Sequence, residues 1–159
     1  MTLIRHYASP LGGVTVACDG RALTGLWFDG QKRFGATLPP DAAEGSSPLL
    51  DAAVLWLDRY FSGADPGPTP PLAPEGTPFQ KRVWALLADI PRGGLHSYGE
   101  LAAALGSSAR AVGGAVGRNP ISIMIPCHRV VGAAGLTGYA GGLDRKAALL
   151  ALEENRSNE

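Results

Sequence analysis

The proline-rich segment at residues 62–78 constrains the fold of this chain more than any other feature. It holds six prolines and three glycines in a chain of 159 residues. Proline lacks an amide hydrogen and fixes φ, so this segment cannot form the interior of a helix or a central strand. We therefore expect an extended connection between two parts. The sequence predicts an N-terminal domain at residues 1–65, a linker at 66–77 and a C-terminal domain at 78–159.

Before the linker, the sequence predicts a small sheet and one helix. Residues 14–18 and 23–28 are β-prone runs, and Asp19-Gly20 between them is a turn signal, so we expect a hairpin. Residues 48–61 carry apolar side chains at helical spacing. The prediction is a small antiparallel sheet with this helix packed on it.

After the linker, apolar spacing predicts a mostly helical domain. A helix at residues 79–90 ends before Pro91, and two short helices follow at 98–105 and 109–116. Two short helices joined by a tight, glycine-containing turn are a helix-turn-helix candidate, although plain helical cores contain the same pattern. The expected fold class is therefore α+β.

Two further segments of the C-terminal part have readable patterns. Residues 121–125 are a β-branched run and are expected to form a strand. Residues 144–153 are expected to form a helix with Asp144 as its N-cap. Inside the helix at 109–116, Gly113 and Gly114 each cost about 1 kcal/mol relative to alanine, and a close approach of a ligand or a backbone is one reason for such residues.

The composition excludes several classes of protein. Hydrophobic residues make up 45% and charged residues 18%, a globular balance, and no apolar run is long enough to span a membrane. The N-terminus lacks a secretion signal, so we expect a cytoplasmic protein. The formal net charge is zero, with five Lys/Arg against eight Asp/Glu in residues 1–75 and nine against six in residues 76–159. This distribution permits DNA binding by the second half without requiring it.

Cys127, with His128 beside it, is the candidate centre of chemistry. Only Cys18 accompanies it, too few for a disulfide framework or a four-cysteine metal site, and Cys18 is interpreted as a packing residue. A thiol reacts as its thiolate, which needs a base, and His128 is the obvious one. Neighbouring side chains diverge, so a bridging water is favoured over a direct hydrogen bond. An acidic residue of the last helix, Glu153 or Glu154, would orient the imidazole. The alternative is a buried cysteine that acts as a small hydrophobe.

The segment Ile125-Pro-Cys-His-Arg-Val130 resembles the active-site signature of the O6-alkylguanine-DNA alkyltransferases, also called methylated-DNA–protein-cysteine methyltransferases. Ser9-Pro-Leu-Gly12 and the hairpin after it resemble the more variable N-terminal part of that family. Across residues 76–153 the further matching segments, in chain order, are Gly76-Thr-Pro-Phe-Gln80, Val83-Trp84, Ile90-Pro91, Ser97-Tyr-Gly-Glu-Leu101, Arg110-Ala-Val-Gly113, Asn119-Pro120, Gly138-Tyr139, Gly141-Gly142, Arg145-Lys146 and Leu149-Leu150 with Glu153.

The resemblance implies a fold, a reaction and a partner. The N-terminal sheet and helix would be ribonuclease-H-like, and the helix-turn-helix would enter the minor groove of double-stranded DNA that contains O6-alkylguanine. The damaged nucleotide would be flipped out of the duplex, and Cys127 would take the alkyl group irreversibly in a single turnover. No cofactor, membrane or obligate protein partner is implied, and a monomer is expected. Some relatives hold a structural zinc in the N-terminal part, but Cys18 is the only cysteine outside the active site, so no metal is expected in this chain.

The resemblance also assigns roles to individual residues. Glu153, His128 and a water would form the relay that generates the Cys127 thiolate, and Tyr98 would stabilise the leaving guanine. Asn119 would tie the recognition helix to the active-site segment. These are the implied catalytic residues: Cys127, His128, Glu153, Tyr98 and Asn119. The implied substrate and DNA contacts are Arg110 as the finger inserted into the base stack, Tyr98, Ala111, Gly113, Gly114, Arg129, Val130, and Tyr139 in the alkyl pocket.

Two departures from the family pattern accompany these matches. The turn between the two helices, Leu105-Gly-Ser-Ser-Ala-Arg110, is shorter than usual, which bears on DNA affinity more than on thiol chemistry. The loop at residues 132–138 is also shorter, which bears on the alkyl pocket.

Three other functions are compatible with parts of the sequence. A non-enzymatic relative that only binds the lesion typically has tryptophan at the nucleophile position, where this chain has Cys127. A helix-turn-helix regulator would not need Tyr98, Asn119, His128 and Glu153 together. A cysteine hydrolase would need an oxyanion hole, and the sequence shows no motif for one.

Overall fold

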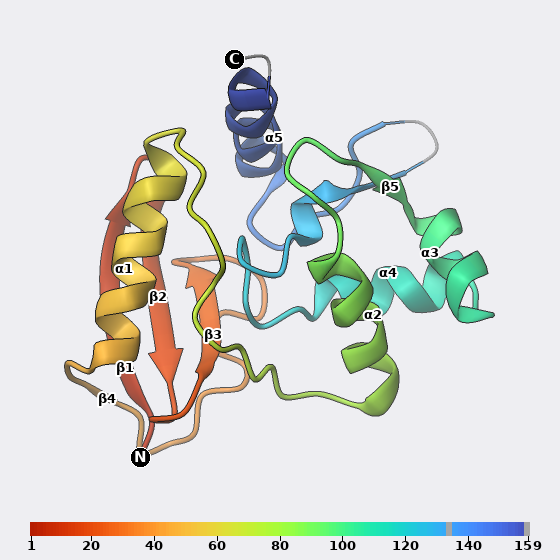
Figure 1. Ribbon diagram of the computed structural model, residues 1–159. Coiled ribbons are helices and arrows are strands. Elements are labelled where there is room, and N and C mark those ends of the chain that lie inside the picture. The colour runs from red at the N-terminus through yellow and green to blue at the C-terminus, as the bar shows by residue number, and fades with distance from the viewer. Residues whose placement is uncertain (133–134, 158–159) are drawn as a thin grey trace.

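A four-stranded sheet with one helix on its face forms the N-terminal part of the computed structural model, which describes residues 1–132 and 135–157 (Figure 1). The strand order is β3-β2-β1-β4. The predicted hairpin is confirmed, but the sheet is mixed rather than wholly antiparallel, because β4 pairs parallel to β1. Sequence patterns also left out β1, which pairs with β2 from Leu3↔Cys18 to Ser9↔Gly12. The strands are β1 (Leu3–Ser9), β2 (Gly12–Cys18), β3 (Leu23–Phe28) and β4 (Ala43–Glu44).

The helix α1 (Pro48–Phe61) has the predicted bounds, and local signals explain them. Ser47 caps its N-terminus by accepting a hydrogen bond from the Leu50 amide, and Pro48 occupies the first turn, where its missing amide hydrogen costs nothing. Its apolar stripe is buried against β1 and β2. Cys18 is fully buried in the same core, with its sulfur 3.4 Å from the Ser47 hydroxyl, as a packing residue would be.

The proline-rich linker runs beside the sheet in an extended form. The Leu23 amide donates to the Pro71 carbonyl at 2.8 Å, and the Ala73 amide donates to the Leu23 carbonyl at 2.8 Å. The linker thereby covers part of the outer edge of β3, which would otherwise leave backbone groups unpaired. The assignment of two domains with boundaries at 65 and 78 stays a prediction.

Helices α2, α3 and α4 pack together in the C-terminal part (Figure 1). Thr77 with Gln80, and Ser97 with Glu100, form capping boxes, while Gly106 ends α3 in the left-handed conformation that glycine adopts without strain. Of the two serines expected to cap α4, Ser108 does so. The helices are α2 (Pro78–Ala88), α3 (Tyr98–Leu105) and α4 (Ala109–Gly117), so the predicted helix-turn-helix pair is present.

The segment after α4 contradicts the predicted strand at 121–125. It forms turns, and only Ile121 makes a bridge, to Leu26 of β3. The reason is tertiary, because the Asn119 side chain binds both ends of this segment and Ile123 adopts a positive φ of 72°. A short 3-10 turn, η1 (Cys127–Arg129), follows.

The last helix closes the structure over both parts. α5 (Leu143–Ser157) begins one residue earlier than predicted, so Asp144 lies in its first turn and is not its N-cap. Upstream, β6 (Val130–Val131) pairs parallel with β5 (His96–Ser97). None of the helices in the described ranges, residues 1–132 and 135–157, is long and apolar enough to cross a membrane.

The two parts are joined through their backbones and share one buried core. The Leu26 amide donates to the Pro120 carbonyl, and the Ser122 amide donates to the Leu26 carbonyl. Arg145 of α5 donates from Nε to the Leu11 carbonyl in the β1–β2 turn at 3.0 Å. The sheet therefore fixes the position of the segment that leads to Cys127.

Replacing Leu57 with alanine tests the packing of α1 on the sheet. Leu57 is completely buried, so Leu57→Ala is expected to lower the free energy of unfolding by about 2–5 kcal/mol. Leu55 on the same helix is 50% exposed, so Leu55→Ala should change it by less than about 0.5 kcal/mol. Urea unfolding of both variants measures this, and equal losses would contradict the assigned face of the helix.

Candidate active site around Cys127

Cys127 lies at the wall of a pocket of about 170 Å³ between the helix-turn-helix and the N-terminal part. Cys127 is 5% exposed. Its amide donates to the Ile125 carbonyl at 2.7 Å, and this bond shapes the turn that presents the thiol. The pocket is lined by Lys32, Arg33, Tyr98, Gly113, Val116, Gly117, Asn119, Ser122, Cys127, Gly138, Tyr139 and Ala140. Of the predicted site residues, the structure therefore brings Cys127, Tyr98, Asn119, Gly113 and Tyr139 together.

Asn119 fastens the end of α4 to the segment before Cys127. Its Nδ2 donates to the Ile125 carbonyl at 2.8 Å, and its Oδ1 accepts from the Ile121 amide at 3.0 Å. The residue is 6% exposed, so these bonds form away from competing water. The side chain thus has the hinge geometry that the family resemblance implied.

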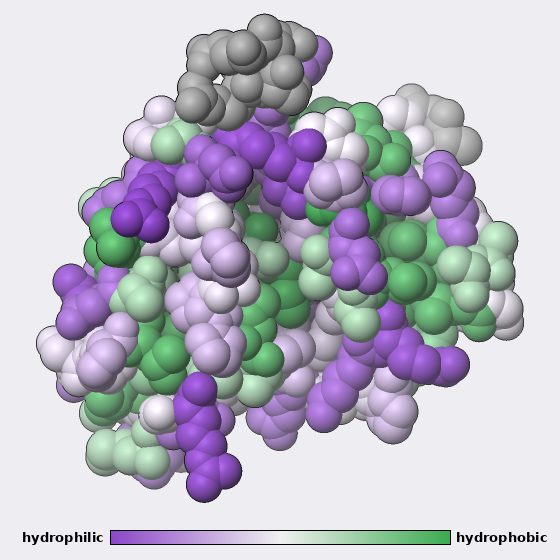
Figure 2. Space-filling view, viewed as in Figure 1, coloured by the Kyte–Doolittle hydropathy of each residue, from purple (hydrophilic) through white to green (hydrophobic). Residues whose placement is uncertain are grey.

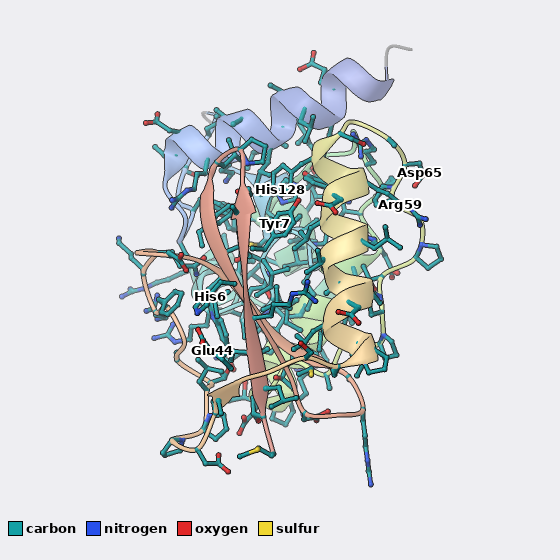
Figure 3. All side chains as sticks on the ribbon, turned by 90° about the vertical axis from the view of Figure 1, so that its left-hand side faces the viewer. His6, Tyr7, Glu44, Arg59, Asp65 and His128 are labelled. Atoms are coloured by element: carbon teal, nitrogen blue, oxygen red, sulfur yellow. The ribbon has the colours of Figure 1, made fainter. Side chains whose placement is uncertain are left out.

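His128 forms a buried hydrogen bond with Glu153. Its Nε2 lies 2.6 Å from Glu153 Oε2, and the two side chains are 0% and 1% exposed. Figure 3 shows His128 inside the molecule, beneath α5 and behind the strands of the sheet. The pattern of residues alone left two candidates for the acidic partner of His128, Glu153 and Glu154. In the structure the partner is Glu153.

The other ring nitrogen of His128 is Nδ1. Nδ1 is buried and makes no hydrogen bond within the described part of the chain. Since Nε2 faces a carboxylate, Nε2 carries the hydrogen and Nδ1 of the neutral ring is the acceptor. No direct hydrogen bond joins Cys127 to His128 among the described contacts, and the water expected between them stays a prediction.

The relay residues have shifted pKa values. Burial raises the pKa of the Cys127 thiol to about 11, opposed by the Asn119 amide and the Lys146 ammonium, so the resting thiol is protonated. Burial lowers the pKa of His128, although Glu153 acts in the opposite direction, and the ring is neutral at neutral pH. Burial alone would raise the pKa of Glu153, but hydrogen bonds from His128 and Arg129 lower it to about 2.

Arg129 and Val130 do not line the pocket, contrary to their expected role in contacting substrate or DNA. Arg129 donates from Nε to Glu153 Oε1 and from Nη1 to the Ile90 carbonyl, both at 2.7 Å. Val130 is completely buried, and its carbonyl accepts from the Lys146 ammonium at 2.6 Å. In the structure, Arg129 holds Glu153, and the Val130 side chain packs in the core.

Sequence reasoning missed two buried residues, Tyr60 and Lys146. The Tyr60 hydroxyl of α1 donates to Glu153 Oε2 at 2.6 Å. The Lys146 ammonium donates to three carbonyls, of Val130, Thr137 and Gly138, and its side chain is fully buried. A lysine inside an amphipathic helix gives a weak signal, because only the fold shows that it points inward.

Two exposed cations of the N-terminal part, Lys32 and Arg33, were also missed. Both line the Cys127 pocket, and Arg33 has a positive φ of 58°, uncommon outside glycine. The Lys32 amide donates to the Ala140 carbonyl at 3.2 Å, which joins this loop to the C-terminal part. Only the three-dimensional arrangement brings a loop from so early in the chain to the pocket.

The helix α4 and its C-terminal end present small residues and arginines at the surface. Arg110, Ala111 and Arg118 are exposed, and Gly113 and Gly114 are partly exposed. Figure 2 shows pale to deep green, mildly to strongly hydrophobic residues gathered over the side of the molecule where Figure 1 places α3 and α4. The short turn before Arg110 is well formed and capped, whereas residues 133 and 134 of the short loop at 132–138 lie outside the described residues.

The two lowered pKa values predict a loss of stability in acid. A group with a lowered pKa in the folded state stabilises it above the ordinary pKa and loses that contribution as pH falls. We expect stability to fall as the pH drops below about 6.5, because of His128. It should fall further between pH 4.5 and about pH 2, because of Glu153. Urea unfolding at a series of pH values measures it.

Glu153→Gln is the matched variant for this acid loss. This variant should be less stable by about 3 kcal/mol at neutral pH, because the substitution breaks the ion pair between Glu153 and Arg129. Its stability should fall less steeply below pH 4.5. Parallel curves for the two proteins would contradict the assignment of the acid loss to Glu153.

Comparison with known proteins places both parts of the chain in one family. Residues 78–155 match the family described as "6-O-methylguanine DNA methyltransferase, DNA binding domain", and residues 3–73 match its "ribonuclease-like domain". The methylated-DNA–protein-cysteine methyltransferase of Haemophilus influenzae is 42% identical over 153 residues, which cover 94% of this chain and 84% of the relative. That of Methanosarcina barkeri is 48% identical over 151 residues, covering 92% and 94%.

Solved structures agree with the sequence relatives. The crystal structure of Mycobacterium tuberculosis OGT in complex with DNA superposes with a TM-score of 0.87 at 44% identity, covering 97% of this chain and 94% of that one. The α+β fold with a ribonuclease-like N-terminal part, and the family resemblance read from the sequence, are confirmed. The chain belongs to the 6-O-methylguanine DNA methyltransferase family, whose members transfer a methyl group from DNA to a cysteine of the protein.

Proposed function

We propose that the chain repairs O6-alkylguanine by moving the alkyl group to Cys127, once per molecule. The observation that carries this proposal is the position of the Cys127 thiol in a pocket, next in sequence to His128, whose buried Nδ1 has no hydrogen-bond partner among the described residues. The sulfur attacks the alkyl carbon in line with the bond to O6. The carbon–oxygen bond breaks, guanine leaves with the electron pair, and a thioether remains on Cys127. A thioether is stable to hydrolysis, so the alkyl group stays on Cys127 and the protein acts once.

The proton of the thiol would leave through His128. The resting Cys127 is protonated, so attack requires its proton to pass through a water to Nδ1 of His128. The ring then becomes an imidazolium, and the Glu153 carboxylate on Nε2 stabilises it. Arg129 keeps Glu153 ionised, and the Lys146 ammonium favours the thiolate. Each group thus acts on one proton transfer.

Tyr98 would stabilise the guanine as it leaves. Its hydroxyl donates to the Thr137 carbonyl at 3.3 Å, a long bond that a guanine nitrogen can replace. Burial raises the pKa of Tyr98, as does the nearby Cys127, so it remains a donor at neutral pH. Tyr139 lines the other side of the pocket, and its buried hydroxyl has no well-formed hydrogen bond in the described part of the chain. We assign Tyr139 to the alkyl pocket.

The helix-turn-helix would bind duplex DNA from the minor groove and hold the flipped nucleotide. A base within the stack cannot reach Cys127, so the reaction requires a flipped base. The exposed Arg110, at the start of α4, can fill the gap in the stack, because its planar cation both stacks and donates hydrogen bonds. Ala111, Gly113 and Gly114 allow the helix to approach the sugar-phosphate walls closely.

The remaining expectations follow from the same reaction. The acceptor is the protein's own thiol, so the chemistry needs no cofactor or metal. We propose that a monomer suffices, because the pocket is built from one chain, and that the protein works in the cytoplasm.

Intact-mass spectrometry tests the proposed function. After incubation with a duplex containing O6-methylguanine, the protein is expected to gain one methyl group in place of one hydrogen, mapped to Cys127, with a stoichiometry of one. Cys127→Ser should gain none while still binding the duplex. Tight, lesion-preferring binding without a mass change in the wild type would instead assign the protein to the non-enzymatic, lesion-binding relatives.

Alanine substitutions in α4 test its approach to DNA. Space for a Cβ exists at both glycines, since the nearest atoms would lie 3.9 Å away at Gly113 and 3.7 Å away at Gly114. Gly113→Ala and Gly114→Ala should therefore keep or raise stability, by up to about 1 kcal/mol. Both should slow alkyl transfer from duplex DNA by about tenfold or more, because a small displacement of the reacting atoms is costly.

Rates with a free alkylated base separate the two glycines. Gly113 lines the Cys127 pocket, so only Gly113→Ala should also slow transfer from free O6-benzylguanine. Ala52→Gly, on the exposed side of α1, is the control, which should destabilise the fold by about 1 kcal/mol and leave both rates unchanged. Unchanged duplex rates in both α4 variants would refute the assigned DNA-binding face.

A further inference from the structure

The Tyr60 hydroxyl and the His128 ring bind the same oxygen of Glu153. Tyr60 Oη and His128 Nε2 each lie 2.6 Å from Glu153 Oε2, while Arg129 binds Oε1. Tyr60 belongs to α1 of the N-terminal part, far in sequence from the other three, and is 1% exposed. A side chain of the ribonuclease-like part therefore contacts the proposed proton relay directly.

Packing fixes the Tyr60 ring independently of its hydroxyl. The ring stacks on Trp56 with centroids 5.4 Å apart and planes inclined by 9°, and the edge of Phe61 meets it at 5.2 Å. The Arg92 guanidinium lies over the ring, 5.6 Å from its centroid. These contacts involve only the ring, so a phenylalanine can occupy the same place without the hydroxyl.

The hydroxyl can act only as a donor at this position. Burial raises the pKa of Tyr60 far above its ordinary value, and the adjacent Glu153 charge raises it further. A carboxylate oxygen accepts but does not donate, so the Tyr60 hydrogen points at Oε2. A second donor on Oε2 withdraws electron density from the oxygen that also receives the His128 hydrogen, and it fixes the plane of the carboxylate.

We propose that Tyr60 is a positioning residue for alkyl transfer, which sets through Glu153 how readily His128 accepts the Cys127 proton. The proposal rests on the relay role of His128 and Glu153 proposed above. With Tyr60 bound, Glu153 holds the imidazolium less strongly, so His128 stays neutral and able to accept a proton at lower pH. The N-terminal part thereby contributes to the chemistry and not only to stability.

The charged and titratable groups around this centre are known from each neighbouring element. Arg129 of η1 and Glu153 and Lys146 of α5 act on His128, and Tyr60 of α1 donates to Glu153. Arg92, after α2, acts on Tyr60, and Lys146 also acts on Cys127. Substituting Tyr60 by phenylalanine removes one hydroxyl and leaves every formal charge in place. A change in pH dependence would therefore report the hydrogen bond and not a lost charge.

The test is the pH dependence of single-turnover alkyl transfer from saturating O6-methylguanine duplex, in the wild type and in Tyr60→Phe. The wild-type rate should fall in acid as His128 becomes protonated. In Tyr60→Phe the freed Glu153 oxygen should hold the His128 proton more tightly. The acid limb of the rate profile should then move to higher pH by about one unit.

Tyr7→Phe is the matched control for removing a tyrosine–carboxylate hydrogen bond. The Tyr7 hydroxyl donates to Asp58 Oδ1 at 2.8 Å between β1 and α1, outside the relay. Its pH profile should overlay that of the wild type. A Tyr60→Phe profile that also overlays the wild type, or one lowered equally at all pH values, would overturn the role of Tyr60 and leave the relay intact. A wild-type profile without an acid limb would overturn the relay itself.

Site-specific incorporation of difluorotyrosine at position 60 covers the case in which Tyr60→Phe does not fold. The fluorinated phenol has nearly the same shape and is a stronger donor, so the acid limb should move in the opposite direction, to lower pH. Thermal unfolding of each protein establishes that it is folded. An unchanged acid limb in this protein would overturn the proposal, whatever the fate of the phenylalanine variant.

Discussion

A carboxylate buried away from water is stable only where donors replace its hydration, and in this protein Glu153 is that carboxylate. Removing an ion from water costs several kcal/mol even after the protein relaxes. Its donors come from separate places: His128 and Arg129 from the turn that bears Cys127, and Tyr60 from the N-terminal helix α1. The Glu153 carboxylate has all three donors only when α5, η1 and α1 are packed together. Correct folding and the proposed proton relay therefore depend on the same buried group.

The turn that presents Cys127 depends on a second long-range constraint. Ile123 is β-branched and buried at a φ of 72°, a conformation that costs about 1–3 kcal/mol. It persists because Asn119 binds the backbone on both sides of it, at Ile121 and Ile125, and because Leu26 of the sheet pairs with the same segment. The strained residue precedes Cys127 in the same segment. The contacts of Asn119 and Leu26 hold this segment in a conformation that its own backbone preferences would not select.

These two constraints explain which features the sequence could predict. Helix bounds follow from local signals such as the Ser47 cap, Pro91 and Gly106, and the structure reproduces them closely. The β-branched run at residues 121–125 has the local pattern of a strand. It forms turns instead, because the Asn119 side chain and Leu26 of β3 bind its backbone. Tyr60 gave no signal either, because an aromatic residue at helical spacing is ordinary core until the fold shows what its hydroxyl meets. Local chemistry is readable in a sequence, whereas contributions across the two parts are not.

Neither local signals nor packing within the described part of the chain accounts for the glycines of α4. Gly113, Gly114 and Gly117 each weaken the helix, and none would bring a Cβ closer than ordinary van der Waals contact to the rest of the chain. The protein's own fold therefore does not require glycine at these positions. Glycine is required at these positions only if something outside the chain approaches the helix closely. A flipped nucleotide would approach the face of α4 that lines the pocket, and the DNA backbone would approach its exposed face. The proposed contact of α4 with DNA would account for the stability that these glycines cost the helix.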